Sequence, residues 1–267
     1  VLVPNITFYA TAVPIVKLGA IPVFCDCDLR TGNISPKDIE KKITKKTKAV
    51  VITHLCGHPC DMNEIIKIVK KHRIKLIEDC SHAHFSRYKN KLVGTFGHVS
   101  IFSMDKNKLL SVGEGGILVT NYKNIFEKAL LISDFGDRLK TINNKSLKKY
   151  ADTGFGFKHR INPIASIIAF YEMDNLKKYI KLRHEKLNYL TKNLNKIEGI
   201  EGPHTSKDVF RGAYYSYRPF YDKRKFDNLN IKGFISIMQS EGVQIRQSGN
   251  PPLHTLQYFK DWYKSNN

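Results

Sequence analysis

Short apolar runs alternate with amphipathic helical patterns through the first half of this 267-residue chain. Such runs are typical of buried strands when helices lie between them. Strand–helix–strand units are joined by right-handed crossovers, which makes the joined strands parallel. The pattern therefore predicts an α/β fold with a mainly parallel sheet. The expected strands lie at residues 22–26, 49–53, 75–78, 99–103 and 117–119.

The second half of the chain is expected to be largely helical until its pattern changes after Gly199. The aromatic, alternating segment 214–221 predicts an antiparallel strand, and a further strand is expected at 243–246. We place a domain boundary near residue 180. Helices are expected to begin at Ser35–Pro36 and to cover residues 62–72, 123–133, 162–176, 180–196 and 231–240, with a polar loop at 143–149.

The chain is strongly basic, with 44 lysines and arginines against 24 aspartates and glutamates, a formal net charge of +20. Such a charge suits nucleic acid, an anionic surface or a phosphorylated substrate. The lysines are spread along the chain in pairs such as Lys41–Lys42 and Lys177–Lys178, so we expect no nucleic-acid partner. No apolar run approaches the roughly 20 residues of a membrane span, so we expect no membrane partner and see no signal peptide.

Cysteine and histidine residues raise the question of a metal site. The five cysteines are odd in number and lie in apolar segments, which predicts reduced, buried thiols in a cytoplasmic protein. His54, Cys56, His58 and Cys60 follow one another two residues apart, and this spacing fits no standard zinc pattern. We therefore expect no metal site.

Lys108 lies between the expected strand 99–103 and the glycine turn 113–116. A lysine in such a place is a candidate Schiff-base nucleophile, because a desolvated amine reaches its neutral form readily. Taken alone, one lysine in so basic a chain is more often a solvated surface charge. Other residues must decide between the two interpretations.

A dense polar group follows the strand at 75–78, in the order Glu78, Asp79, Cys80, Ser81, His82, Ala83, His84. Ligands of parallel α/β sheets bind beyond the carboxyl ends of the strands. An aspartate there can pair with a pyridinium nitrogen, or it can simply cap the next helix. Taken alone, His82 and His84 are each more often structural histidines than ligand-binding ones. The residues alone leave these alternatives open.

Five segments follow one another along nearly the whole chain: 3–11 (VPNITFYAT), 54–62 (HLCGHPCDM), 78–84 (EDCSHAH), 102–116 (FSMDKNKLLSVGEGG) and 156–163 (GFKHRINP). A weaker sixth segment is 251–254. The ordered set is specific, although no single segment is. In this order the segments resemble one family, the DegT/DnrJ/EryC1/StrS nucleotide-sugar aminotransferases, which are pyridoxal-phosphate enzymes of the aspartate-aminotransferase fold (fold type I).

The resemblance implies a role for each matching residue. Lys108 would form the Schiff base with pyridoxal 5'-phosphate, and Asp79 would bond the pyridinium nitrogen. A lysine here argues against the family's dehydratases, which typically carry histidine. Phe8 would stack on the cofactor ring, and His82 would contact the ring or its 3-oxygen. Ser103 would bind the cofactor phosphate, together with Lys158 from the neighbouring subunit.

The resemblance also implies the reaction: a nucleotide-linked keto-sugar is aminated with glutamate or glutamine as donor, in sugar, polysaccharide or glycan biosynthesis. It implies a cytoplasmic homodimer with shared active sites and a parallel sheet sandwiched by helices. Residues 141–162 and 214–221 are where we expect substrate contacts. The basic surface would favour an anionic nucleotide sugar.

The chain departs from the family at both ends. Members usually carry a helical leader and a Ser-Gly-Thr-type phosphate loop upstream, and continue beyond Trp262. We therefore expect residues 1–180 to form a large cofactor-binding domain without its N-terminal part, and residues 181–267 an incomplete small α/β domain. The missing phosphate donors would weaken cofactor binding. The alternative function is a non-catalytic or weakly active shortened homologue that serves as a binding or regulatory subunit.

Overall fold

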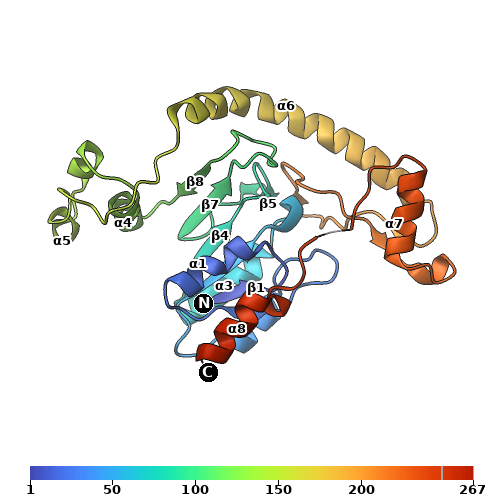
Figure 1. The fold of residues 1–267 in the computed structure, drawn as a ribbon, viewed down its shortest axis with the longest axis horizontal. Coiled ribbons are helices and arrows are strands. Elements are labelled where there is room, and N and C mark those ends of the chain that lie inside the picture. Colours follow the sequence, from blue (N-terminus) through green and yellow to red (C-terminus); the bar gives the residue numbers. More distant parts are fainter. Residues whose placement is uncertain (248, 267) are drawn as a thin grey trace.

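A six-stranded sheet forms the centre of the computed structural model, which describes residues 1–247 and 249–266 (Figure 1). Its strand order is β2-β1-β3-β4-β7-β8, and every neighbouring pair is parallel except β7 with β8. The predicted mainly parallel sheet is confirmed. The strands are β1 (Leu2–Pro4), β2 (Val23–Cys25), β3 (Ala49–Thr53), β4 (Lys75–Asp79), β7 (Val99–Ser103) and β8 (Gly116–Val119).

Helices α2 (Pro36–Lys42) and α3 (Met62–His72) pack on one face of the sheet. The Ser35 side chain caps α2 and the Asp61 side chain caps α3, each by accepting a hydrogen bond from a backbone amide three residues on. Alternate strand residues point to this face, so a continuous core forms between the layers. Its fully buried members include Leu2, Ile39, Val50, Ile52, Met62, Ile65 and Leu76.

The opposite face of the sheet is covered by α1 (Val13–Lys17) and by α8 (Gln257–Asn266), which comes from the far end of the sequence. Phe259 of α8 packs edge-on against Phe24 at a ring-centroid distance of 5.1 Å. The Tyr263 hydroxyl donates to the carbonyl of Pro22. The last helix of the chain thus stabilises the sheet formed by its first residues.

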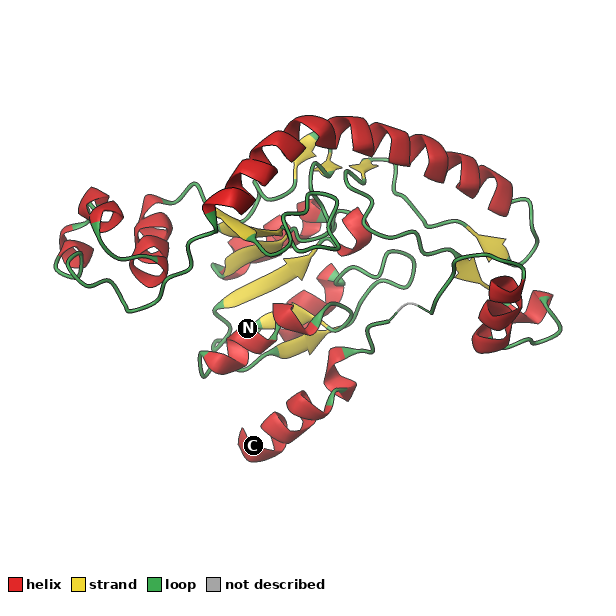
Figure 2. Cartoon of the chain, turned by 45° about the horizontal axis from the view of Figure 1, so that its top comes forward, coloured by secondary structure: helices red, strands yellow, loops and turns green. Residues whose placement is uncertain are grey.

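Helix α6 (Pro163–Leu194) is one continuous helix of 32 residues that curves past the sheet (Figure 2). The prediction of two helices, 162–176 and 180–196, is wrong. Asn162 caps its start, and residues 164–194 contain neither glycine nor proline, so nothing in the sequence breaks it. The predicted domain boundary near residue 180 falls inside α6 and stays a prediction. Within the described residues, no helix has the length and apolarity to cross a bilayer.

Smaller elements surround the sheet. The segment with α4 and α5 extends away from it as a separate lobe, and α7 lies at the other end of α6 (Figure 1). The smaller helices are α4 (Lys123–Ser133), α5 (Lys145–Lys148) and α7 (Ile231–Ser240). The smaller strands form a sheet of β5 (Arg87–Tyr88), β6 (Lys91–Leu92) and β10 (Val209–Phe210) and a pair of β9 (Ile200–Glu201) with β11 (Phe220–Tyr221). The 3-10 helices are η1 (Tyr9–Thr11), η2 (Leu55–Gly57), η3 (Asp137–Thr141), η4 (Lys223–Lys225) and η5 (Leu253–Thr255).

Three local predictions fail for identifiable reasons. The expected loop 143–149 contains α5, because the Asn144 side chain caps a short helix. The expected strand 214–221 shrinks to β11, and Tyr214 has a left-handed backbone with φ of 44°. The expected strand 243–246 is irregular, since the Gln239 side chain donates to the Ile245 carbonyl and ties this segment to α7.

Candidate active site

Two neighbouring parallel strands bring the main predicted site residues to one edge of the sheet. Asp79 is the last residue of β4 and pairs in register with Ile101 of β7, so Ser103, the last residue of β7, lies nearby. Lys108 is in the turn after β7, where its amide donates to the Asp105 carbonyl at 2.8 Å. This edge is where ligands of parallel sheets bind.

The Asp79 carboxylate is buried and oriented by two hydrogen bonds. The Thr11 hydroxyl donates to its Oδ2 at 2.8 Å, and the Ser81 amide donates to its Oδ1 at 3.1 Å. Thr11 is in turn bonded to Thr7, whose hydroxyl also contacts that of Thr53. Residues 80–86 form turns rather than a helix, so Asp79 is not a helix cap. The interpretation as a ligand-binding carboxylate remains.

Lys108 is half-buried beside this carboxylate. Burial lowers the pKa of its amine below the ordinary lysine value, although the charges of Asp105 and Asp79 act in the opposite direction. The following turn keeps its shape through Gly113, at a φ of +85°, and Gly115, where a Cβ would lie 2.9 Å from Val112. Lys108 therefore has the partly desolvated surroundings of a nucleophilic lysine.

His82 lies in the turn that follows Asp79, and its ring is buried against Tyr215, which comes from a distant part of the sequence. Its ring stacks on that of Tyr215, with centroids 3.9 Å apart and planes 9° apart. Burial, together with the charges of Lys108 and Arg218, lowers the pKa of His82 to about 3. The Cys56 amide donates to Nδ1 at 3.4 Å. The neutral ring therefore carries its proton on Nε2, which can donate to a ligand.

The other residues predicted to contact the cofactor, Phe8, Ser103 and Lys158, do not form one cluster. Phe8 is 46% exposed, packs on Tyr9 at 4.1 Å between centroids, and directly precedes the short helix that delivers Thr11 to Asp79. The Ser103 hydroxyl accepts from the Asp105 amide at 3.3 Å. Lys158 is exposed in the α4–α5 lobe, with its amine 5.5 Å from the centroid of the Phe135 ring, and not among the residues at the sheet edge.

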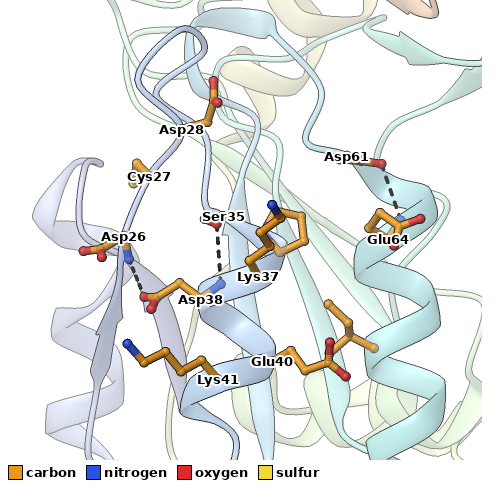
Figure 3. Close-up of a pocket in the computed structure, with 12 residues that line it drawn as sticks. Asp26, Cys27, Asp28, Ser35, Lys37, Asp38, Glu40, Lys41, Asp61 and Glu64 are labelled. Atoms are coloured by element: carbon orange, nitrogen blue, oxygen red, sulfur yellow. Dashed lines mark hydrogen bonds between the residues drawn. The ribbon is translucent and has the colours of Figure 1, made fainter.

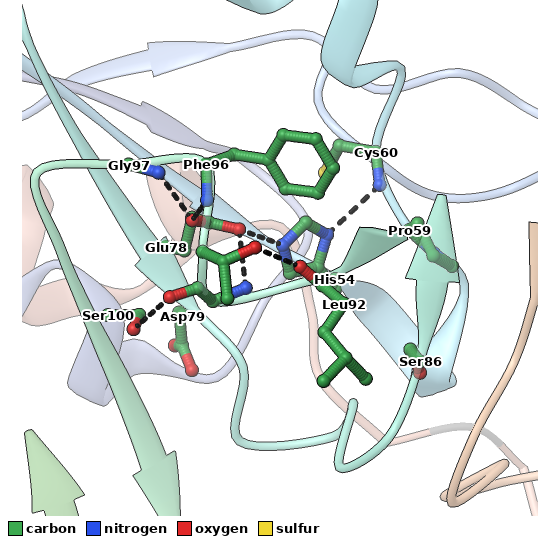
Figure 4. Close-up of polar contacts among 12 residues, drawn as sticks. His54, Pro59, Cys60, Glu78, Asp79, Ser86, Leu92, Phe96, Gly97 and Ser100 are labelled. Atoms are coloured by element: carbon green, nitrogen blue, oxygen red, sulfur yellow. Dashed lines mark hydrogen bonds and ion pairs between the residues drawn. The ribbon is translucent and has the colours of Figure 1, made fainter. Parts of the chain in front are cut away.

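Glu78 anchors the strand end from the other side of the sheet (Figure 4). Its carboxylate accepts from the backbone amides of Gly94 at 2.7 Å, Phe96 at 2.8 Å and Gly97 at 2.6 Å, and it contacts His54 Nε2 at 3.1 Å. Burial alone would raise the pKa of Glu78. Its hydrogen bonds outweigh this and hold the pKa below the ordinary value.

Within the described residues, His54, Glu78 and Cys80 form the one group close enough together to hold a metal ion. Both ring nitrogens of His54 are already used, because the Cys60 amide donates to Nδ1 at 3.0 Å and Nε2 faces Glu78. Burial raises the pKa of the Cys80 thiol well above its ordinary value, so it stays protonated. His54 and Glu78 are thus engaged in internal hydrogen bonds, and a protonated thiol is a poor metal ligand.

A separate surface groove lies at the starts of α2 and α3 (Figure 3). Asp38 in this groove accepts from the Asp26 amide at 2.7 Å and pairs with Lys42 at 2.7 Å. The predicted site residues are not part of its lining. The lining residues are Asp26, Cys27, Asp28, Ser35, Pro36, Lys37, Asp38, Glu40, Lys41, Asp61, Glu64 and Ile68.

Two residues at the site were not singled out from the sequence. Thr11 orients Asp79 although 68 residues separate them, and Tyr215 contacts both His82 and Lys108. The sequence signal for Tyr215 was its aromatic segment, 214–221, in which substrate contacts were expected. Thr11 closes the motif 3–11, but nothing in that motif shows which side chain it meets.

A sequence profile of the DegT/DnrJ/EryC1/StrS aminotransferase family matches residues 1–267. The chain belongs to this family. The resemblance that the motifs predicted is thereby confirmed.

Two curated relatives share the name GDP-perosamine synthase. The chain is 37% identical to that of Escherichia coli O157:H7 over 210 residues, which cover 79% of this chain and 55% of the relative. It is 35% identical to that of Vibrio cholerae over 262 residues, which cover 97% of this chain and 68% of the relative. The chain thus spans between about half and two thirds of these proteins.

The solved structures confirm the predicted fold class. The aminotransferase from Psychrobacter cryohalolentis matches this family member with a TM-score of 0.86 at 27% identity, over 97% of this chain and 69% of that one. The fold is therefore the α/β fold of type I aminotransferases, whose mainly parallel sheet and covering helices are described above.

Membership in this family implies pyridoxal 5'-phosphate as the cofactor. The residues at the sheet edge fit this group chemically. Asp79 offers a buried, oriented carboxylate for a ring nitrogen, Lys108 offers a half-buried amine, and His82 offers an Nε2 proton to a ring oxygen. A carboxylate suits a protonated ring nitrogen, and an amine of lowered pKa suits an aldehyde.

Proposed function

We propose that this chain carries the catalytic centre of a pyridoxal-phosphate aminotransferase that aminates a keto-sugar linked to a nucleoside diphosphate. Glutamate or glutamine would supply the amino group. The observation that carries the proposal is the half-buried Lys108, with its lowered pKa, at the same sheet edge as the oriented carboxylate of Asp79. The names of the two relatives, both GDP-perosamine synthases, support a nucleotide-sugar substrate.

Asp79 and Lys108 would have the two catalytic roles. When bound, pyridoxal phosphate supplies an electron sink, provided that its ring nitrogen stays protonated. The Asp79 carboxylate would hold that proton, and Thr11 and the Ser81 amide keep its oxygens in place. The Lys108 amine would bond the cofactor covalently and, once displaced by the amino donor, move the proton between the donor carbon and the cofactor carbon.

The other predicted residues would bind the cofactor. Phe8, which is partly exposed next to the Thr11 turn, would cover a face of the ring. The Ser103 hydroxyl would donate to the phosphate, and His82 would donate from Nε2 to the ring or its 3-oxygen. Lys158 would reach the phosphate of the neighbouring subunit, and its exposed amine near Phe135, away from the sheet edge of its own chain, supports this role.

A homodimer with shared active sites follows from this role of Lys158. Its support is the apolar surface at the start of α6, where Ile164, Ile167, Phe170 and Tyr171 are each more than half exposed. A face of this kind is typical of subunit contacts. We further propose a cytoplasmic location, because all five cysteines are free thiols, as is usual in a reducing compartment.

The first experiment asks whether Lys108 binds the cofactor. Purified protein is mixed with pyridoxal phosphate, treated with borohydride and digested, and the modified peptide is identified by mass spectrometry. We expect the visible absorbance of a lysine-bound cofactor and a label on Lys108. Lys108→Ala should lose both, whereas Lys106→Ala, an exposed neighbour in the same turn, should retain them.

A label that survives in Lys108→Ala would refute the assignment of Lys108. The second experiment supplies glutamate and a keto-sugar nucleotide and measures formation of the amino sugar. Binding of pyridoxal phosphate without amination would favour the alternative function, a weakly active binding or regulatory subunit. Amination that requires Lys108 would establish the aminotransferase.

A further inference from the structure

Tyr215 lies between the two functional groups at the sheet edge. Its ring stacks on the His82 imidazole, with centroids 3.9 Å apart and planes 9° apart. The Lys108 amine lies 4.5 Å from the centroid of the same ring. The near-parallel stack fixes the plane of the imidazole, and the aromatic ring takes the place of water beside the amine.

The segment of Tyr215 is also tied to the other side of His82. The Arg218 guanidinium donates from Nε to the Ser216 hydroxyl at 3.1 Å, and that hydroxyl donates to the Cys56 thiol at 3.0 Å. The Cys56 backbone has a φ of 53°, in the left-handed region, and its amide donates to His82 Nδ1. One segment thus constrains both the ring face and Nδ1 of the histidine.

We propose that Tyr215 is a positioning residue: it keeps the His82 imidazole in one plane and one tautomer, with the Nε2 proton available to a ligand, and it excludes water from the Lys108 amine. The consequence for the reaction rests on the proposed aminotransferase function, since His82 and Lys108 are the groups that would meet the cofactor. The effect of Tyr215 on the plane and tautomer of His82 does not depend on a bound cofactor.

The charges around His82 favour the same state of the ring. Lys108 faces it from the turn after β7, Arg218 from the segment of Tyr215, and His84 from its own turn. Each of these groups disfavours a second positive charge, and burial disfavours it most. Tyr215 supplies part of that burial, so removing its ring should admit water and let His82 become protonated more readily.

The test uses cofactor-free protein labelled with ¹⁵N-histidine, in which NMR reports the tautomer and titration of His82. His82→Asn identifies its signals among the ten histidines of the chain. Wild type and Tyr215→Phe should show a ring that is protonated at Nε2 and stays mostly neutral from pH 8 down to pH 4. Tyr215→Leu should titrate at least one pH unit higher than wild type and lose its single tautomer.

Tyr217→Leu is the matched control, because Tyr217 lies in the same segment but hydrogen-bonds the Thr191 hydroxyl at 3.0 Å. It should leave the His82 signals unchanged. If Tyr215→Leu does not fold, Tyr215→Met removes the ring with a more adaptable side chain. An unchanged His82 in the ring-deleted variant would overturn the proposal, and so would a shifted His82 in Tyr215→Phe.

A second measurement addresses Lys108. The pH dependence of pyridoxal-phosphate attachment to Lys108, trapped with borohydride and read by mass spectrometry, should move up by about one pH unit in Tyr215→Leu but not in Tyr215→Phe. If the pH dependence of attachment does not change in Tyr215→Leu, Tyr215 does not shield the Lys108 amine from water. If no variant binds the cofactor, the proposed function fails while the NMR result still decides the role of Tyr215.

Discussion

Glu78 and Asp79 are neighbours on β4, yet the regions around them differ in kind. Glu78 is fully buried and bonded to three backbone amides and to His54 (Figure 4). Asp79 points to the other face, where two hydrogen bonds orient it beside a half-buried lysine. One region ties backbone segments together, whereas the other holds the carboxylate and the amine to which we assign the catalytic roles.

The difference shows how one strand end serves both stability and chemistry. The Glu78 region uses its hydrogen bonds to fix the loop 94–97 against β4, and the position of Asp79 depends on that rigid strand end. Functional groups must be placed on a rigid support, since small displacements reduce catalysis strongly. We therefore expect mutations in the two regions to separate stability from activity.

The largest expected effect is the loss of stability in Glu78→Gln. The amide loses the negative charge and turns an NH₂ group toward backbone donors, so we expect the free energy of unfolding to fall by about 3 kcal/mol. Urea unfolding followed by circular dichroism measures this change. Glu64→Gln, in an exposed pair with Lys67 on α3, should cost less than about 0.5 kcal/mol. Equal losses in both variants would contradict the anchoring role of Glu78.

Asp79→Asn should give the opposite result. A neutral amide cannot hold the cofactor ring nitrogen protonated, so we expect the half-reaction with glutamate to slow by about 100-fold or more. Single-turnover absorbance measurements give this rate. The free energy of unfolding should fall by only about 1 kcal/mol, because the amide oxygen still accepts the Thr11 hydrogen bond and only the bond from the partly buried Ser81 amide is lost. A large loss of stability with an unchanged rate would make Asp79 structural.

The smallest expected effect concerns His84, whose Nε2 is buried without a hydrogen-bond partner in the described part of the chain. Burial, with the charge of Lys108, lowers the pKa of His84 to about 4 from 6.5. As the pH falls below 6.5, His84 becomes protonated in the unfolded chain but stays neutral in the folded protein. The free energy of unfolding therefore falls until about pH 4, where the folded form also takes up the proton. At pH 5 this difference in protonation lowers the free energy of unfolding by about 2 kcal/mol.

His84→Leu should therefore show a weaker loss of stability between pH 7 and pH 5 than the wild type does. Urea unfolding at pH 5, 6 and 7 measures the slope. The buried His58 and His82 keep part of the acid sensitivity, since their pKa values are lowered to about 4 and about 3. The exposed His159→Gln is the control and should keep the wild-type slope. The same slope in His84→Leu would show that this ring is not kept neutral by the fold.

Much of the fold could be predicted because its signals are local. Strand β3 and helices α3, α4 and α7 have the predicted bounds, since side-chain periodicity and capping residues lie within each segment. The edge that carries Asp79 and Lys108 also followed from the sequence, because crossover rules place the ends of parallel strands together.

The failed strand at 214–221 and the unpredicted return of α8 depend on contacts between distant segments. The aromatic residues of 214–221 alternate as in a strand, but Tyr215 packs on His82 and Lys108, and Tyr217 hydrogen-bonds Thr191, instead of pairing with a neighbouring strand. The return of α8 to the first strands rests on contacts such as Phe259 with Phe24, which no local pattern contains. Tertiary packing overrides local propensity in such places.

The sequence by itself determined the α/β fold and the family, and it predicted the catalytic roles of Lys108 and Asp79, because spacing along the chain encodes periodicity and motifs. Only the tertiary structure showed that Thr11 orients Asp79, that Glu78 is an anchor and that Tyr215 stacks on His82. These pairs come from segments that are close in space but far apart in sequence. Their effect depends on distance, burial and direction, which are properties of the folded chain.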